Sequence, residues 1–76
     1  MTACEIQDLL IWTLVRNVGG SQRQWRLAIG PVRLHDRATH PHCNWSVAPS
    51  GSFQQIEAIE SLLDDVRLAY PIVAKG

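Results

Sequence analysis

The most regular pattern of apolar and polar positions runs from Ser52 to Tyr70. Apolar side chains recur there every three or four residues and polar side chains occupy the opposite side, which is the period of an amphipathic helix. The apolar positions are Phe53, Ile56, Ala58, Ile59, Leu62, Leu63, Val66, Ala69 and Tyr70. Ser52 followed three residues later by Gln55 is a capping-box sequence that starts a helix, and Pro71 ends it. We therefore predict a helix that needs an apolar surface to cover it.

A second helix is predicted near the start of the chain, over residues 3–17. Thr2 and Glu5 form another capping-box sequence, and the glycine pair 19–20 supplies the left-handed ending that helices commonly use. Apolar residues surround this helix almost completely, so we expect it to be buried on more than one side. A strand over residues 10–15 is the alternative, because Ile, Trp, Thr and Val favour strands. The caps at both ends favour the helix.

Between the two helices the apolar period changes to two, which is typical of half-buried strands. Three short runs alternate in this way, separated by Gly30-Pro31 and by a polar loop over residues 36–42. The runs are Trp25, Leu27 and Ile29, then Val32 and Leu34, then Cys43, Trp45 and Val47. In an antiparallel hairpin around residues 30–31, the first two runs oppose each other and share one face. We therefore predict three strands with one common apolar face.

These elements predict a single α+β domain over residues 1–76, with a short apolar tail at 71–76. The predicted order is α-β-β-β-α, and the two helices cover one face of a three-stranded antiparallel sheet in a two-layer sandwich. The other face of the sheet is expected to be open to water. Its residues are Gln24, Arg26, Arg33, His35, Asn44 and Ser46.

The α-β-β-β-α order at this length is similar to that of the double-stranded-RNA-binding domain, and to that of small ribonuclease toxins with the same topology. The likeness covers nearly the whole chain but concerns only the order of elements. RNA-binding members of the first family carry a lysine cluster at the start of the second helix, where this chain has residues 52–55 and then Glu57 and Glu60. The toxin resemblance implies a histidine on the sheet, and His35 is the one placed in a predicted strand.

Composition narrows the possible classes of protein. The 76 residues have zero formal net charge and contain two cysteines, Cys4 and Cys43, which are too few for a secreted disulfide framework. Glu5 and Asp8 precede the first apolar run, unlike a signal peptide, and the longest run, over residues 9–15, is too short to span a membrane. We expect a cytoplasmic protein of bacterial or phage type that does not bind a membrane.

The residues with reactive side chains lack the spacing of a metal or catalytic site. His35, His40, His42 and Cys43 lie close together in sequence, but they do not form the paired ligands of a zinc site. His35 beside Asp36 is the one local acid–base pair, and neither a nucleophile motif nor a phosphate-binding glycine loop accompanies it. We therefore predict no cofactor, no metal and no catalytic residue.

Two groups of residues are candidate binding surfaces. One group lies on the first predicted helix and has no obvious cover, so it predicts a protein interface. The simplest such interface joins two copies in a homodimer, with Trp12 as its anchor. This group comprises Ile11, Trp12, Val15 and Val18. The second is a basic face that could meet an anion or a nucleic acid. It comprises Arg23, Arg26, Arg33, His35 and Arg37.

The leading functional hypothesis is a small non-catalytic interaction module that self-associates and binds another protein. The main alternative is a nucleic-acid-binding module that uses the arginine-bearing open face of the sheet. A third hypothesis is a small ribonuclease-like enzyme that uses His35. Binding to nucleic acid that weakens with salt would favour the second hypothesis, and hydrolysis of RNA that depends on His35 would favour the third.

Overall fold

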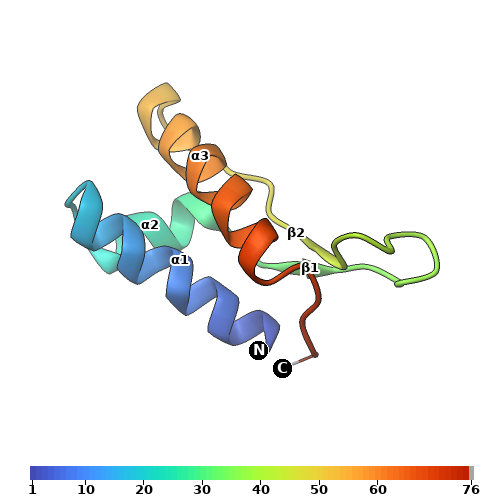
Figure 1. Cartoon of the computed structure of the whole chain (residues 1–76). Coiled ribbons are helices and arrows are strands. Elements are labelled where there is room, and N and C mark those ends of the chain that lie inside the picture. The colour runs from blue at the N-terminus through green and yellow to red at the C-terminus, as the bar shows by residue number, and fades with distance from the viewer. Residues whose placement is uncertain (76) are drawn as a thin grey trace.

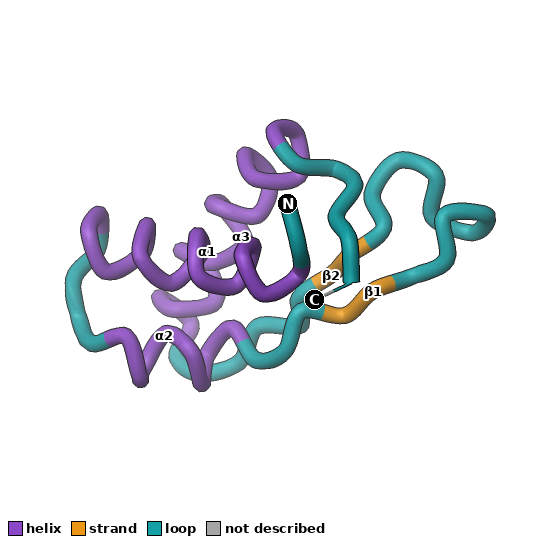
Figure 2. The backbone as a smooth tube through the Cα atoms, turned by 90° about the horizontal axis from the view of Figure 1, so that it is seen from below, coloured by secondary structure: helices purple, strands orange, loops and turns teal. Residues whose placement is uncertain are grey.

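The computed structural model describes residues 1–75 (Figure 1). Over that range the chain forms three helices and one two-stranded sheet, in the order α1 (Ala3–Asn17), α2 (Gln22–Ile29), β1 (Arg33–Leu34), β2 (Trp45–Ser46) and α3 (Phe53–Ala69). The helices gather at one end, and the loop between the strands projects at the other (Figure 1, Figure 2). Among these described residues, no helix is both long and apolar enough to cross a membrane.

α1 and α3 begin where their capping boxes predict. The backbone N–H of Glu5 donates to Thr2 Oγ1 at 3.2 Å, and the backbone N–H of Thr2 donates to Glu5 Oε1 at 3.0 Å. Ser52 and Gln55 exchange the same two bonds at the start of α3, at 3.2 and 2.9 Å. Both predicted helices are therefore confirmed. The alternative strand over residues 10–15 is wrong, because this segment lies inside α1.

Residues 22–29 form a helix, which corrects the prediction of a strand over this stretch. Ser21 caps it in a third capping box. Trp25 and Ile29 are buried whereas Leu27, between them, is 71% exposed, which is a helical burial pattern and not an alternating one. Residues four apart share one side in a helix and in a strand alike, so Trp25 and Ile29 face the core in either structure. Leu27, which is exposed, and Ala28, which is buried, are the residues of this stretch that distinguish the two structures.

The sheet has two strands instead of three, so the predicted two-layer sandwich in the order α-β-β-β-α is wrong. β1 pairs with β2 in antiparallel fashion, with Arg33 opposite Ser46 and Leu34 opposite Trp45. Because residues 24–29 are helical, the expected hairpin around residues 30–31 does not form, and there is no three-stranded face to be covered or left open. The resemblance to double-stranded-RNA-binding domains and ribonuclease toxins rested on that order, so we do not propose a ribonuclease.

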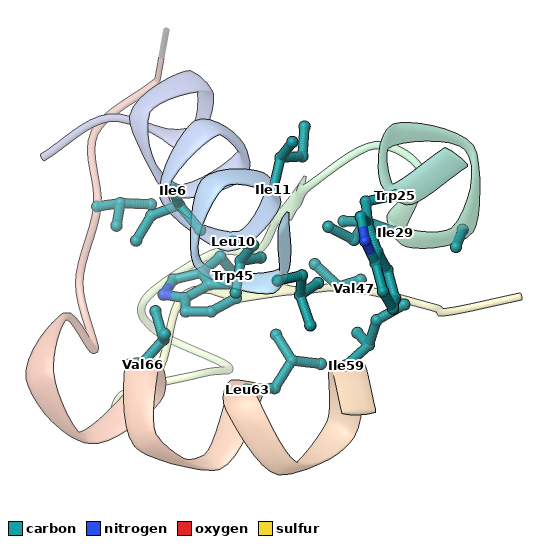
Figure 3. Close-up of a cluster of buried hydrophobic side chains, with 13 residues drawn as sticks. Ile6, Leu10, Ile11, Trp25, Ile29, Trp45, Val47, Ile59, Leu63 and Val66 are labelled. Atoms are coloured by element: carbon teal, nitrogen blue, oxygen red, sulfur yellow. The ribbon is translucent and has the colours of Figure 1, made fainter. Parts of the chain in front are cut away.

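One hydrophobic core lies between the helices and β2 (Figure 3). Trp45 enters it from β2 and is 2% exposed, and its indole N–H donates to the carbonyl oxygen of Tyr70 at 2.8 Å. The other buried members are Ile6, Leu10, Ile11, Leu14, Trp25, Ala28, Ile29, Val47, Ile59, Leu63, Val66 and Val73. Burial of one large aliphatic or aromatic side chain contributes roughly 1.5–3 kcal/mol, so this cluster is the main source of stability.

The predicted apolar tail folds back across the domain. Val73 is buried, which places it in the core. The backbone N–H of Ala3 donates to the carbonyl oxygen of Ala74 at 3.0 Å, and the N–H of Ala74 donates to the carbonyl oxygen of Met1 at 2.9 Å. The tail therefore lies beside the first residues of the chain, where the red and blue ends of the ribbon come close together (Figure 1).

Candidate nucleic-acid interface

α1, the four-residue connection 18–21 and α2 form a helix–turn–helix unit. The two glycines of the connection take φ values of 99° and 92°, which L-residues rarely adopt, so the chain can turn sharply there. The indole N–H of Trp25 donates to the carbonyl oxygen of Gly19 at 2.7 Å, which ties α2 to the turn. Beyond the other end of α2, Gln7 Nε2 donates to the carbonyl oxygen of Gly30 at 3.1 Å. These two bonds hold α2 against α1 near both of its ends.

α2 runs across the direction of α1 (Figure 1). Two crossed helices joined by a short turn that contains glycine are the arrangement found in helix–turn–helix proteins, in which the second helix enters the major groove of DNA. Trp25, Ala28 and Ile29 seat α2 in the core. Its opposite side is exposed, and this side is the one that could meet a ligand.

The exposed side of α2 carries two arginines and two glutamines, Arg23, Arg26, Gln22 and Gln24. Arginine can donate two hydrogen bonds to guanine, and glutamine can pair in the same bidentate way with adenine. The Gln24 side chain already accepts a bond from the Ser21 N–H at 3.4 Å within the capping box. The two arginines and Gln22 are therefore the principal candidates for base contacts.

The loop between β1 and β2 is shaped by its own hydrogen bonds. Asp36 Oδ1 accepts from the N–H of Ala38 at 2.9 Å, and the carbonyl oxygen of Asp36 accepts from the N–H of His40 at 2.8 Å. The rings of His35 and His40 stack with their centroids 4.3 Å apart, and His35 Nε2 lies 2.7 Å from Ser46 Oγ. The loop therefore projects from the domain as an arm with internal structure.

The five residues predicted as an anion-binding face lie on consecutive elements and not on one sheet face. Arg23 and Arg26 are on α2, Arg33 is in β1, and His35 and Arg37 follow β1. The arginines are exposed and His35 is half-buried. α2 and β1 lie along one edge of the molecule, and the loop after β1 extends beyond it (Figure 2). The structure thus moves two arginines from a sheet to a helix, but the elements that carry all five residues follow one edge.

The four residues predicted as a protein interface do not form one surface. Ile11 is 1% exposed and lies in the core, and Val15 is half-buried. Trp12 and Val18 are 53% and 60% exposed. Val18 lines a shallow groove between α1 and α3, together with Leu62. Of the four residues, Trp12 is therefore the one that the structure leaves outside both the core and this groove.

Sequence reasoning missed Gln22 as part of the candidate surface and placed Leu27 in the core. The signal that places both residues on a helix is the capping box formed by Ser21 and Gln24, which have the same spacing as the capping boxes at the starts of α1 and α3. A helix that begins after Ser21 places Gln22 in its first turn and turns Leu27 away from Trp25. The apolar period alone predicts a strand over this segment, whereas its capping box marks the start of a helix.

The histidines and cysteines are spread over the surface and the edge of the core. Within residues 1–75, no three or more His, Cys, Asp or Glu side chains lie together in a way that could hold a metal ion. Cys4 is exposed, Cys43 is half-buried, and both are free thiols. Cys43 Sγ donates to the carbonyl oxygen of Trp45 at 3.3 Å, so this thiol helps to order β2.

Comparisons of the chain with protein-family models, with curated proteins and with solved structures found no match. The functional conclusion therefore depends on the residues described above.

Proposed function

We propose that this chain binds double-stranded DNA, with α2 in the major groove and the loop over residues 35–44 against the flanking backbone. The observation that carries the proposal is the division of α2 into two faces. Trp25 and Ile29 seat the helix in the core, while Arg23 and Arg26 are exposed on the second helix of a helix–turn–helix unit. Arginine contacts to guanine are the commonest specific contacts in the major groove.

The dimensions of α2 suit that groove. With its side chains an α-helix is about 10–12 Å in diameter, which fits the major groove of B-form DNA, about 12 Å wide. The corresponding groove of duplex RNA is too deep and narrow for side chains to read. The geometry therefore supports DNA as the ligand over duplex RNA.

The arginines beyond α2 support contacts to the DNA backbone. Arg33 and Arg37 are exposed in β1 and in the loop that follows it. Phosphate contacts of this kind fix the position of a protein on DNA and make the affinity depend on salt. Four of the seven acidic residues lie on α3, so the zero net charge of the chain conceals a local excess of positive charge. They are Glu57, Glu60, Asp64 and Asp65.

The test is binding to duplex DNA selected from a random pool, measured by fluorescence anisotropy over a series of salt concentrations. The double variant Arg23→Ala/Arg26→Ala is expected to bind the selected duplex at least about tenfold more weakly, because each base contact is worth about 1–3 kcal/mol. Arg37→Ala is expected to weaken binding to all sequences alike and to reduce the salt slope by about one.

Arg67→Ala is the control for Arg37→Ala, because it removes one positive charge from the last turn of α3, an element that is not part of the proposed surface. Its affinity for the selected duplex should equal that of the wild type. The proposal fails if no duplex is selected at low salt, or if the Arg23→Ala/Arg26→Ala variant binds as tightly as the wild type. Equal affinity for duplex RNA would contradict the major-groove geometry.

A further inference from the structure

The exposed face of α1 has one large apolar side chain at its centre, that of Trp12, which the fold leaves largely uncovered. Trp12 is 53% exposed, in contrast to Trp25 and Trp45, which are 4% and 2% exposed. Leu9 and Val15, three residues before and after Trp12, are half-buried. Positions three apart are neighbours on a helix, so Leu9 and Val15 flank Trp12; both pack against the edge of the core, and Trp12 is the apolar side chain of this face that stays uncovered.

Trp12 lies between a negatively charged residue and a positively charged residue on the surface of the helix. Asp8 lies four residues before Trp12 and Arg16 lies four residues after it, and both are exposed. Residues four apart form the second kind of ridge on a helix surface, so Asp8, Trp12 and Arg16 lie in one row. If a second copy of this row runs in the opposite direction, its positive end faces the negative end of the first copy. The row is therefore complementary in charge to an antiparallel copy of itself.

We infer that this face of α1 binds the same face of a second copy, with the two α1 helices antiparallel and Trp12 near the two-fold axis. In that arrangement Asp8 of each copy lies within reach of Arg16 of the other, and the two tryptophans meet at the centre. A two-fold interface requires one surface that is complementary to itself, and the row centred on Trp12 meets this requirement. Packing of such rows from two helices against each other is the commonest helix-packing geometry in globular proteins.

The same charges make DNA a poor occupant of this face. Glu5 and Asp8 both lie on the exposed side of α1, and their carboxylates would repel phosphates. This dimer specifies which face of α1 carries the self-association that the sequence predicts. Its residues are on α1, so they do not include the arginines of α2. The dimer therefore does not depend on DNA binding. A contact between two single helices is smaller than a standard stable interface, so we expect a weak dimer whose population rises with concentration.

The charge pattern allows a test by exchange, with sedimentation equilibrium in the absence of DNA at about 100 µM, where a small interface of this class still associates. The wild type is expected to dimerise. Asp8→Arg and Arg16→Asp, each alone, are expected to be monomeric because like charges then face each other across the axis. An equimolar mixture of the two variants should form a heterodimer, because every facing pair is again of opposite sign. The double variant Asp8→Arg/Arg16→Asp should form a homodimer for the same reason.

Trp12→Gln provides an independent arm of the test. It is expected to be monomeric, whereas Leu68→Gln, which changes an 85% exposed residue of α3 in the same way, should dimerise like the wild type. Thermal melts of every variant confirm that it is folded before its mass is interpreted. A monomeric wild type would leave this face to a different partner and would overturn the inference. A dimer that survives Trp12→Gln, or a mixture of charge variants that stays monomeric, would overturn it as well.

Discussion

The side chain of Asn44 is paired with the backbone of Val73 by two hydrogen bonds, in the way that one strand residue pairs with another. Asn44 Nδ2 donates to the carbonyl oxygen of Val73 at 2.8 Å, and the N–H of Val73 donates to Asn44 Oδ1 at 2.9 Å. Both residues are buried, at 7% and 5% exposure. The backbone of Asn44 is bonded on both sides as well, since its N–H donates to the carbonyl oxygen of Pro71 and its carbonyl oxygen accepts from the N–H of His35. This one side chain therefore fastens the tail to the hairpin.

We predict that Asn44→Ala lowers the free energy of unfolding by about 2–4 kcal/mol, because each buried polar group left without a partner costs about 1–3 kcal/mol. Urea unfolding followed by tryptophan fluorescence measures the loss. Asn17→Ala is the control, since Asn17 is exposed at the end of α1 and a change there should stay within about 0.5 kcal/mol. Equal effects of the two substitutions would show that the pairing contributes nothing.

Two leucines of α3 allow a matched test of the predicted helix face. Leu63 is 2% exposed and Leu68 is 85% exposed. Leu63→Ala is expected to cost about 2–5 kcal/mol, because it removes buried methyl groups and leaves a cavity. Leu68→Ala removes the same atoms from the surface and should change the urea midpoint very little. A large loss from the second substitution would place Leu68 against a partner that the isolated chain does not show.

The helical structure of residues 22–29 can be tested through its cap. Ser21→Ala removes the oxygen that accepts from the Gln24 N–H, and the expected loss is about 1 kcal/mol. Ser61→Ala, in the middle of α3 and exposed, should cause no loss because alanine is the better helix former. Thermal unfolding monitored by circular dichroism compares the two variants. If these residues formed a strand, Ser21 would cap no helix. Ser21→Ala would then cause no more loss of stability than Ser61→Ala.

The capping box of α1 predicts a dependence of stability on pH. The backbone N–H of Thr2, and then its hydroxyl, bond the Glu5 carboxylate and hold the pKa of Glu5 below its ordinary value of 4.5. A pKa that is lower in the folded state favours folding when the group is ionised. The stabilisation is therefore fully present above pH 4.5 and is lost as the pH falls through the lowered value.

The difference in stability between the wild type and Glu5→Gln should accordingly shrink on acidification below pH 4.5. Urea titrations at a series of pH values give this difference directly. Gln7→Ala serves as the comparison, because it alters no titrating group on the same helix and its effect should be the same at each pH. A difference for Glu5→Gln that grows on acidification would reverse the assigned sign.

Local signals predicted α1 and α3 well, because their ends are marked by side chains that bond the nearest backbone groups. Thr2 and Ser52 specify their helix starts within three residues, and no distant contact is needed. The same signal was present at Ser21 for α2. There the short run of Trp25, Leu27 and Ile29 also fits a strand, and eight residues are too few for the period to decide between the two. Burial of Leu27 was the assumption that failed.

The sheet was less predictable because its pairing depends on distant segments. Asn44 was expected on an open polar face, yet it is buried because Val73 offers its side chain two backbone partners. No pattern near Asn44 reports that contact. The charge pattern selects the arginines of the candidate DNA surface. It does not show which element presents them, and Arg23 and Arg26 lie on a helix that takes the place of the predicted strand. Trp12 lies off the apolar side of its own helix, and the structure leaves it 53% exposed; its role in an interface stays a prediction.

The bonds between the tail and the first residues of the chain have a consequence for folding during synthesis. α1 and α2 carry local caps, so the starts of both helices are specified by neighbouring residues alone. The Ala3 N–H, however, bonds to Ala74, and the core receives Val73 from the same segment. A nascent chain that has been translated only to Tyr70 therefore lacks a residue of its core. Met1 and Ala3 therefore gain these backbone partners only after residue 74 has been translated.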